Sequence, residues 1–268
     1  MEMIDFTVPQ YIDKQPFSVY YMTVSGHCRY NQLGNAQSKK NWDLVQHLEH
    51  SDIVKGYFAA NLEFEFAMAS LLRQLEEAGI ADDTLVVIAT DHYPYGLAPS
   101  ATWGNSQNFL EALIGQRVTD SFIRDKSALI IWSGCLEDEE PIIVDDPTFS
   151  PDILPTLSNL FGLEFDSRLL AGRDVFSDAE PLIYSVIYDW KTDKGTYRSL
   201  TGEFTPASED TVIPEGYVER INSIVSNKLT FSSRVINYDY YAQIFGDLSN
   251  IKNTTANLEY LYDTLVKE

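Results

Sequence analysis

Four short apolar runs along the chain have the pattern of buried strands. They cover residues 18–24 (SVYYMTV), 84–90 (TLVVIAT), 128–133 (ALIIWS) and 182–188 (LIYSVIY). Each run is rich in β-branched or aromatic residues and is almost continuously apolar, which is typical of strands covered on both faces. The pattern therefore favours a parallel sheet over a sheet built from hairpins.

The residues between these runs show helical periodicity. Apolar residues recur at helical spacing from Ile53 to Leu75, and Gly79 is placed to end this helix. Further helices are expected over residues 106–114 and 151–161. Strands that alternate with helices predict an α/β fold with a mainly parallel sheet flanked by helices.

The last part of the chain has a different pattern. The stretch KTDKGTYRSL, from residue 191, predicts a turn between short strands, and residues 215–230 have the periodicity of an amphipathic helix. No stretch rich in Pro, Gly and Ser is long enough to mark a flexible linker. We expect residues 1–200 to form the main domain and residues 201–268 to form a helical or irregular appendage packed on it.

Composition narrows the classes of partner. The chain has 268 residues and a net charge of −21, from 19 Lys and Arg against 40 Asp and Glu. Binding to nucleic acid or to an anionic membrane surface needs clustered Lys and Arg, so we expect no nucleic-acid partner. No apolar run approaches the ~20 residues that a membrane span needs, and the opening MEMIDFTVPQ lacks the basic and apolar regions of a signal peptide.

Candidate chemistry lies where two of the expected strands end. Ligands of open α/β sheets bind beyond the carboxyl ends of the strands. The run 18–24 leads into SGHCRY, which places His27 just past its end, and the run 84–90 leads into ATDHYPYG, which places Asp91 and His92 there. A carboxylate oxygen and an imidazole nitrogen together suit Zn²⁺ or Mn²⁺.

Other interpretations of these residues stay open. An Asp-His pair is often a turn with a hydrogen-bonded histidine, and His27 could have a purely structural partner. Cys28 beside His27 could form a nucleophile pair, but consecutive residues of an extended chain point in opposite directions. The acidic run 137–140 has the pattern of a solvated loop and lacks the spacing of a calcium loop.

Three segments resemble a known family. PFSVYYMTVSGH, EEAGIADDTLVVIATDHYPYG and SPDILPTLSNLFG are similar to the lipoteichoic acid synthase-like branch of the sulfatase and alkaline phosphatase superfamily. The resemblance covers about residues 1–190, and AGRDVFSD (171–178) also resembles that branch. These proteins are phosphoglycerol transferases and related hydrolases that act outside the cytoplasmic membrane, and the resemblance implies that location here.

The resemblance also implies roles for individual residues. Asp91 and His92 correspond to ligands of a single divalent ion, usually Mn²⁺, and His27 corresponds to a histidine that contacts the substrate phosphate. Arg29 either adds a phosphate contact or is a surface charge. We expect Tyr93, Pro94, Tyr95 and Trp103 to line the adjoining loop, where aromatic faces would hold the carbon part of a glycerol-like group.

The resemblance departs from the family pattern upstream of the first strand. The family's other metal ligand and its nucleophilic threonine precede the matched part, as do its membrane helices, so no catalytic nucleophile is assigned in this chain. We therefore expect the carboxyl-terminal part of a catalytic domain, which needs a further amino-terminal segment in cis or in trans. Alone, it should bind Mn²⁺ weakly and be inactive on phosphoglycerol-type or other phosphodiester substrates. The alternative is a non-catalytic remnant or a partner-dependent structural half-domain.

Overall fold

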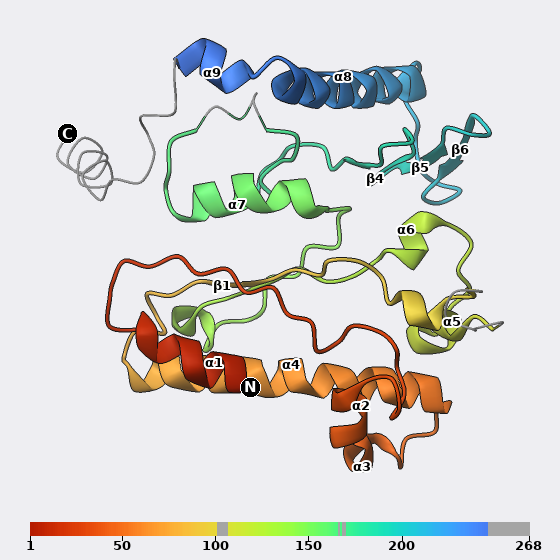
Figure 1. The fold of residues 1–268 in the computed structure, drawn as a ribbon. Helices are drawn as coiled ribbons and strands as arrows, with labels where there is room; N and C mark the ends of the chain where they lie inside the picture. Colours follow the sequence, from red (N-terminus) through yellow and green to blue (C-terminus); the bar gives the residue numbers. More distant parts are fainter. Residues whose placement is uncertain (101–106, 166, 168–169, 246–268) are drawn as a thin grey trace. The chain divides into compact units, whose positions relative to one another are not determined.

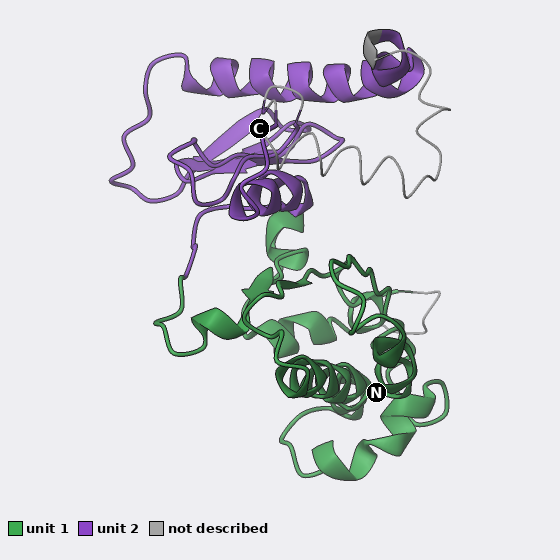
Figure 2. Cartoon of the chain, turned by 90° about the vertical axis from the view of Figure 1, so that its left-hand side faces the viewer, with its two compact units in different colours: residues 1–142 green, residues 143–268 purple. Residues whose placement is uncertain are grey.

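A computed structural model describes residues 1–100, 107–165, 167 and 170–245. Contacts divide the chain into two compact units, residues 1–142 and residues 143–268, which are coloured separately in Figure 2. The boundary expected near residue 200 stays a prediction. None of the helices in the described part of the chain is both long and apolar enough to cross a membrane.

Unit 1 is built around one long helix. Its elements are α1 (Glu2–Thr7), η1 (Val8–Gln10), α2 (Ala36–Lys40), α3 (Trp42–Val45), α4 (Asp52–Glu77), β1 (Val86–Ile88), η2 (Tyr95–Leu97), α5 (Phe109–Ile114), α6 (Ser121–Arg124), β2 (Ile130–Trp132) and η3 (Gly134–Leu136). The helix expected to end before Gly79 is confirmed as α4, and α1 lies along it (Figure 1).

Two apolar clusters hold unit 1 together. In the first, Ile4 of α1 and Leu71 and Leu75 of α4 are buried, and Val86 of β1 and Trp132 of β2 pack against them. The second cluster surrounds buried residues that come from a loop, α4, η2 and α5: Tyr30, Val54, Leu97 and Leu110. The first cluster covers one face of the strand pair, and the second anchors the loops that follow the expected strands.

The parallel arrangement expected for the first sheet is wrong for the strands that pair. β1 and β2 run antiparallel, with Val86 opposite Trp132 and Ile88 opposite Ile130. A continuous apolar run indicates that a strand packs against other elements. It does not indicate the direction of the strand, which depends on the segment that joins it to its neighbour. The connection from β1 to β2 holds α5 and α6, and a connection of that length permits either direction.

The run 18–24 is also not a strand in the described structure. Its inward positions include Tyr21, which packs against the first cluster and bonds the hydroxyl groups of Thr7 (2.7 Å) and Tyr11 (3.0 Å). On the alternate positions, Tyr20 is 85% exposed and Met22 and Val24 are each 73% exposed. Tyr21 is therefore the anchor of this segment, and the alternate positions present apolar side chains to solvent.

Replacing Tyr21 and Tyr20 in turn should change the free energy of unfolding by very different amounts. Tyr21→Ala removes buried contacts and two hydroxyl partners, so we expect it to lower the free energy of unfolding by about 3 kcal/mol. Tyr20→Ala removes an exposed ring and should change that free energy by less than about 0.5 kcal/mol. Urea denaturation of both variants measures the difference, and equal losses would contradict the anchoring described here.

Unit 2 is a small sheet covered by a helix. Its elements are η4 (Ser150–Asp152), α7 (Ile153–Leu160), β3 (Ile183–Tyr184), β4 (Trp190–Thr192), β5 (Gly195–Arg198), β6 (Glu203–Pro206), α8 (Tyr217–Asn237) and α9 (Tyr240–Phe245). The strands form an antiparallel sheet in the order β3-β4-β5-β6, so the predicted turn between short strands is confirmed.

The core of unit 2 centres on a tryptophan. Trp190 is fully buried among Tyr217, Ile221 and Val225 of α8, and its indole N–H donates to Asn222 Oδ1 at 2.7 Å. This contact explains the amphipathic pattern that predicted a helix over 215–230. It also joins residues on both sides of position 200 in one cluster.

Candidate functional site

Two loops of unit 1 meet beside α4, and two glycines let them approach. A Cβ atom at Gly56 of α4 would lie 2.3 Å from the carbonyl oxygen of Tyr30. A Cβ atom at Gly96 would lie 2.9 Å from ring carbons of Tyr30 and 3.1 Å from Cβ of Cys28. Contacts this close exclude any side chain, so the loop that carries His27 is seated against both α4 and the loop after β1.

Asn35 holds the His27 loop from the other side. Its amide nitrogen donates to the carbonyl oxygen of His27 at 2.8 Å and to that of Ser25 at 3.4 Å. Its side-chain oxygen accepts bonds from the backbone N–H groups of Gln37 and Ser38, which caps α2. One side chain thus starts a helix and fixes the position of the neighbouring loop.

The structure brings His27, Asp91 and His92 together. The ring centroids of His27 and His92 are 6.4 Å apart, with the rings perpendicular. Nε2 of His92 lies 3.6 Å from Oδ2 of Asp91, and the side chain of Asp91 is 95% exposed. The three groups, which come from two loops, therefore face one exposed region.

Backbone carbonyls fix the tautomer of both histidines. Nδ1 of His27 lies 3.0 Å from the carbonyl oxygen of Cys28, and Nδ1 of His92 lies 2.7 Å from that of Tyr93. A carbonyl oxygen only accepts hydrogen bonds, so each Nδ1 carries the proton and each neutral ring keeps a lone pair on Nε2. Histidines that bind metal ions are usually oriented in this way.

The donor set suits a divalent metal ion in type and in spacing. Ligand atoms about 2.0–2.2 Å from one ion lie roughly 3 to 3.6 Å apart, and the 3.6 Å between Asp91 Oδ2 and His92 Nε2 is within that range. Among the described residues, no group of three or more His, Cys, Asp or Glu side chains is arranged to hold a metal ion. Asp91 and His92 are the pair that fits such an ion in part.

The remaining expected site residues lie in different surroundings. Arg29 is exposed, and Tyr93 is half-buried beside the second cluster. Trp103 lies outside the described residues. Sγ of Cys28 is 3.7 Å from Nδ1 of His27, but burial raises the pKa of the Cys28 thiol, which disfavours the thiolate that a nucleophile pair needs.

Sequence reasoning did not assign a stacking role to Tyr95 and did not identify Arg124. The ring of Tyr95 is stacked on His92 with centroids 3.8 Å apart, and Tyr93 meets Tyr95 edge-on at 4.9 Å. The guanidinium of Arg124, at the end of α6, lies 4.6 Å from the centre of the Tyr93 ring. Loss of hydration and the charge of Asp91 raise the pKa of Tyr95, which stays protonated near neutral pH. The contact of Arg124 with Tyr93 depends on tertiary packing, so no local sequence pattern signals it.

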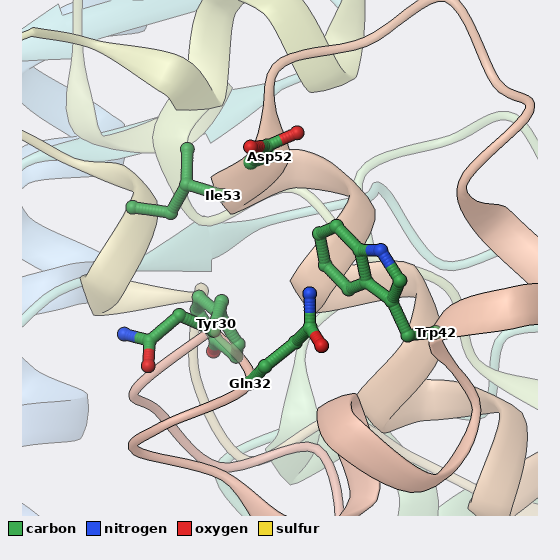
Figure 3. A pocket seen from close by; sticks show the side chains of 6 residues that line it. Tyr30, Gln32, Trp42, Asp52 and Ile53 are labelled. Atoms are coloured by element: carbon green, nitrogen blue, oxygen red, sulfur yellow. The ribbon is translucent and has the colours of Figure 1, made fainter.

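Two hollows on unit 1 are lined by other residues. One, of about 270 Å³, is lined by Tyr30, Asn31, Gln32, Trp42, Asp52 and Ile53, and Figure 3 shows the Gln32 amide beside the Trp42 ring. The second, of about 290 Å³, is lined by Ile114, Gln116, Ile123, Lys126 and Ser127. Neither lining includes His27, Asp91 or His92. Those three side chains lie on loops at the surface rather than inside these two hollows.

Unit 1 thus combines helices and strands with a carboxylate and two histidines on adjoining loops. The sulfatase family model matches residues 2–163. The chain belongs to the sulfatase family, and its curated relatives include several lipoteichoic acid synthases, so the resemblance stated from the sequence is confirmed.

The relatives are distant and longer than this chain. Lipoteichoic acid synthase 1 of Bacillus subtilis is 23% identical over 84% of this chain and 33% of its own length. The synthase of Staphylococcus aureus is 23% identical over 61% of this chain and 23% of its own length. The chain thus spans about a third or less of these relatives. The solved lipoteichoic acid synthase LtaP from Listeria monocytogenes aligns with a TM-score of 0.60, at 18% identity over 88% of this chain and 58% of that chain, which shows the fold.

Proposed function

We propose that this chain supplies part of the active site of a metal-dependent phosphoglycerol transferase or phosphodiester hydrolase. Asp91 and His92 would hold one divalent ion, with Mn²⁺ the expected metal, and His27 would contact the substrate phosphate. The observation that carries the proposal is the convergence of the three side chains, with His92 holding a lone pair on Nε2 beside Asp91. By analogy with the lipoteichoic acid synthases it matches, the protein would act on the outer side of the cytoplasmic membrane.

The residues of the site have separate tasks in this proposal. When bound, the ion supplies a positive charge that polarises a phosphoryl oxygen. His27, once protonated on Nε2, donates a hydrogen bond to a phosphate oxygen and stabilises the charge that develops there. Tyr93 and Tyr95 offer ring faces and edges to the carbon part of a glycerol-like group, with Trp103 as a further expected contact. Arg29 is exposed and free to approach an anionic substrate.

A second candidate is that the chain works as a half-domain with another polypeptide segment. The exposed side chains of Tyr20, Met22 and Val24 favour it, since three such residues at alternate positions of one segment are typical of a surface that another segment covers. In this candidate the chain acts structurally or through its partner and binds metal weakly or not at all. The two candidates therefore differ in the role they give to Asp91 and His92.

The turnover of the isolated chain tests the proposal that its site is incomplete. With saturating Mn²⁺, we expect no hydrolysis of phosphoglycerol lipids or aryl phosphodiesters above background, because two protein ligands hold the ion weakly and no family nucleophile is assigned. A segment that supplies the other ligands, fused or added in trans, should restore metal affinity first and turnover second. Robust turnover by the isolated chain that is lost in Asp91→Ala would instead show a complete site.

A further inference from the structure

A row of aromatic rings in contact links His92, a candidate metal ligand, to α6. His92 stacks on Tyr95 at 3.8 Å, Tyr95 meets the edge of Tyr93 at 4.9 Å, and the guanidinium of Arg124 lies 4.6 Å from the centre of Tyr93. A hydrogen bond between the hydroxyl groups of Thr90 and Ser127 also ties the residue before Asp91 to the segment after α6. Arg124 is thereby held on the same side of unit 1 as the candidate site.

The side chain of Arg124 is oriented by its neighbour. Nε and Nη2 donate to the two carboxylate oxygens of Asp125 at 2.7 and 2.9 Å, which occupies one edge of the planar guanidinium. These bonds raise the pKa of Arg124, so its charge persists at every physiological pH. Among the described residues, no acceptor is recorded for Nη1, and the side chain is 40% exposed. The second edge of the guanidinium is therefore available to a ligand.

The negative charge around the site makes a positively charged contact necessary for an anionic substrate. Asp91 and Asp125 place two carboxylates near the rings, in a chain whose net charge is −21. An anionic substrate needs a compensating cation in such a field. Arginine is suited to this task because two parallel N–H groups of one edge match two oxygens of a phosphate group.

We infer that Arg124 binds the phosphate group of the substrate through the guanidinium edge that Asp125 leaves open. Asp125 and the ring of Tyr93 hold the guanidinium in place, at the end of the row of rings that begins at His92. The inference rests on the proposed function. It extends that function by naming Arg124 of α6 as the positively charged side chain that binds the substrate phosphate. It defines the preferred ligand as a phosphate ester or diester with a small organic group.

Calorimetric titration of the full chain with glycerol 3-phosphate, with and without saturating Mn²⁺, tests the inference. Arg124→Gln should weaken binding about 10-fold to 100-fold, the usual effect of losing a charge-assisted pair of bonds. Arg124→Lys keeps the charge but lacks the planar fork, so it should recover part of the affinity. Arg117→Gln, which removes the same charge from an exposed position of unit 1, is the matched control and should bind as the unmodified chain does.

The outcomes separate this inference from the proposed function. Loss of binding in Arg124→Gln alone, with an unchanged melting temperature, supports the inference. Equal binding by Arg124→Gln and the unmodified chain overturns it, as does a failure of the unmodified chain to bind glycerol 3-phosphate. Neither of those results touches Mn²⁺ binding by Asp91 and His92, which is measured separately and decides the proposed function.

Discussion

Gly56→Ala should destabilise unit 1, although alanine normally stabilises a helix interior. Substituting alanine for glycine at an exposed position would add about 1 kcal/mol of helix stability. At Gly56 the new Cβ would lie 2.3 Å from the carbonyl oxygen of Tyr30, a backbone atom that moves only with its whole loop. Overpacking of this kind costs about 3 kcal/mol, so we expect a net loss of about 2 kcal/mol and a fall in melting temperature of about 5 °C.

Gly56→Ala should weaken ligand binding at the candidate site as well as destabilise unit 1. The displaced loop carries His27, so glycerol 3-phosphate binding should weaken along with the melting temperature. Ala69→Gly, at an exposed position of the same helix, isolates helix propensity and should lower the free energy of unfolding by about 1 kcal/mol with unchanged binding. An increase in stability for Gly56→Ala would show that the loop is not seated on α4 as described.

The longest helix of unit 1 follows from local sequence. The periodicity from Ile53 to Leu75 and the glycine at position 79 predict α4 because both features act within a few turns of one helix. The direction of β1 and β2 had no such local signal. The run 18–24 shows the same limit, since its apolar residues predict a covered strand, whereas only Tyr21 of this run is half-buried in the described structure.

Part of the candidate site could be predicted because its residues follow directly after a strand. Asp91 and His92 follow β1 by a few residues, so the rule for ligands at strand ends places them without knowledge of the fold. Tyr95 and Arg124 join the site through stacking on His92 and Tyr93. The contact between Arg124 and Tyr93 joins residues about thirty positions apart, and no spacing in the sequence encodes it, whereas Tyr95 lies only three positions after His92.

Asp91→Asn should remove most of the affinity of the chain for Mn²⁺. The substitution keeps the size of the side chain but deletes the negative charge of one of two expected ligands, and affinity depends on ligand charge and number. We expect the dissociation constant to rise by about 100-fold or more. Asp83→Asn, an exposed carboxylate before the other end of β1, is the matched control and should leave it unchanged. Calorimetric titration with MnCl₂ measures both.

Nitrogen coupling to bound Mn²⁺, measured by electron spin echo envelope modulation, tests the central claim most directly, because it reports whether a histidine ring is a ligand. The lone pair on Nε2 of His92, 3.6 Å from Asp91, predicts a clear nitrogen signal from Mn²⁺ bound to the unmodified chain. That signal should vanish in His92→Gln and persist in His47→Gln, an exposed histidine of the same unit. A spectrum without nitrogen coupling, or one that His92→Gln leaves unchanged, would contradict the assignment of Asp91 and His92 as metal ligands.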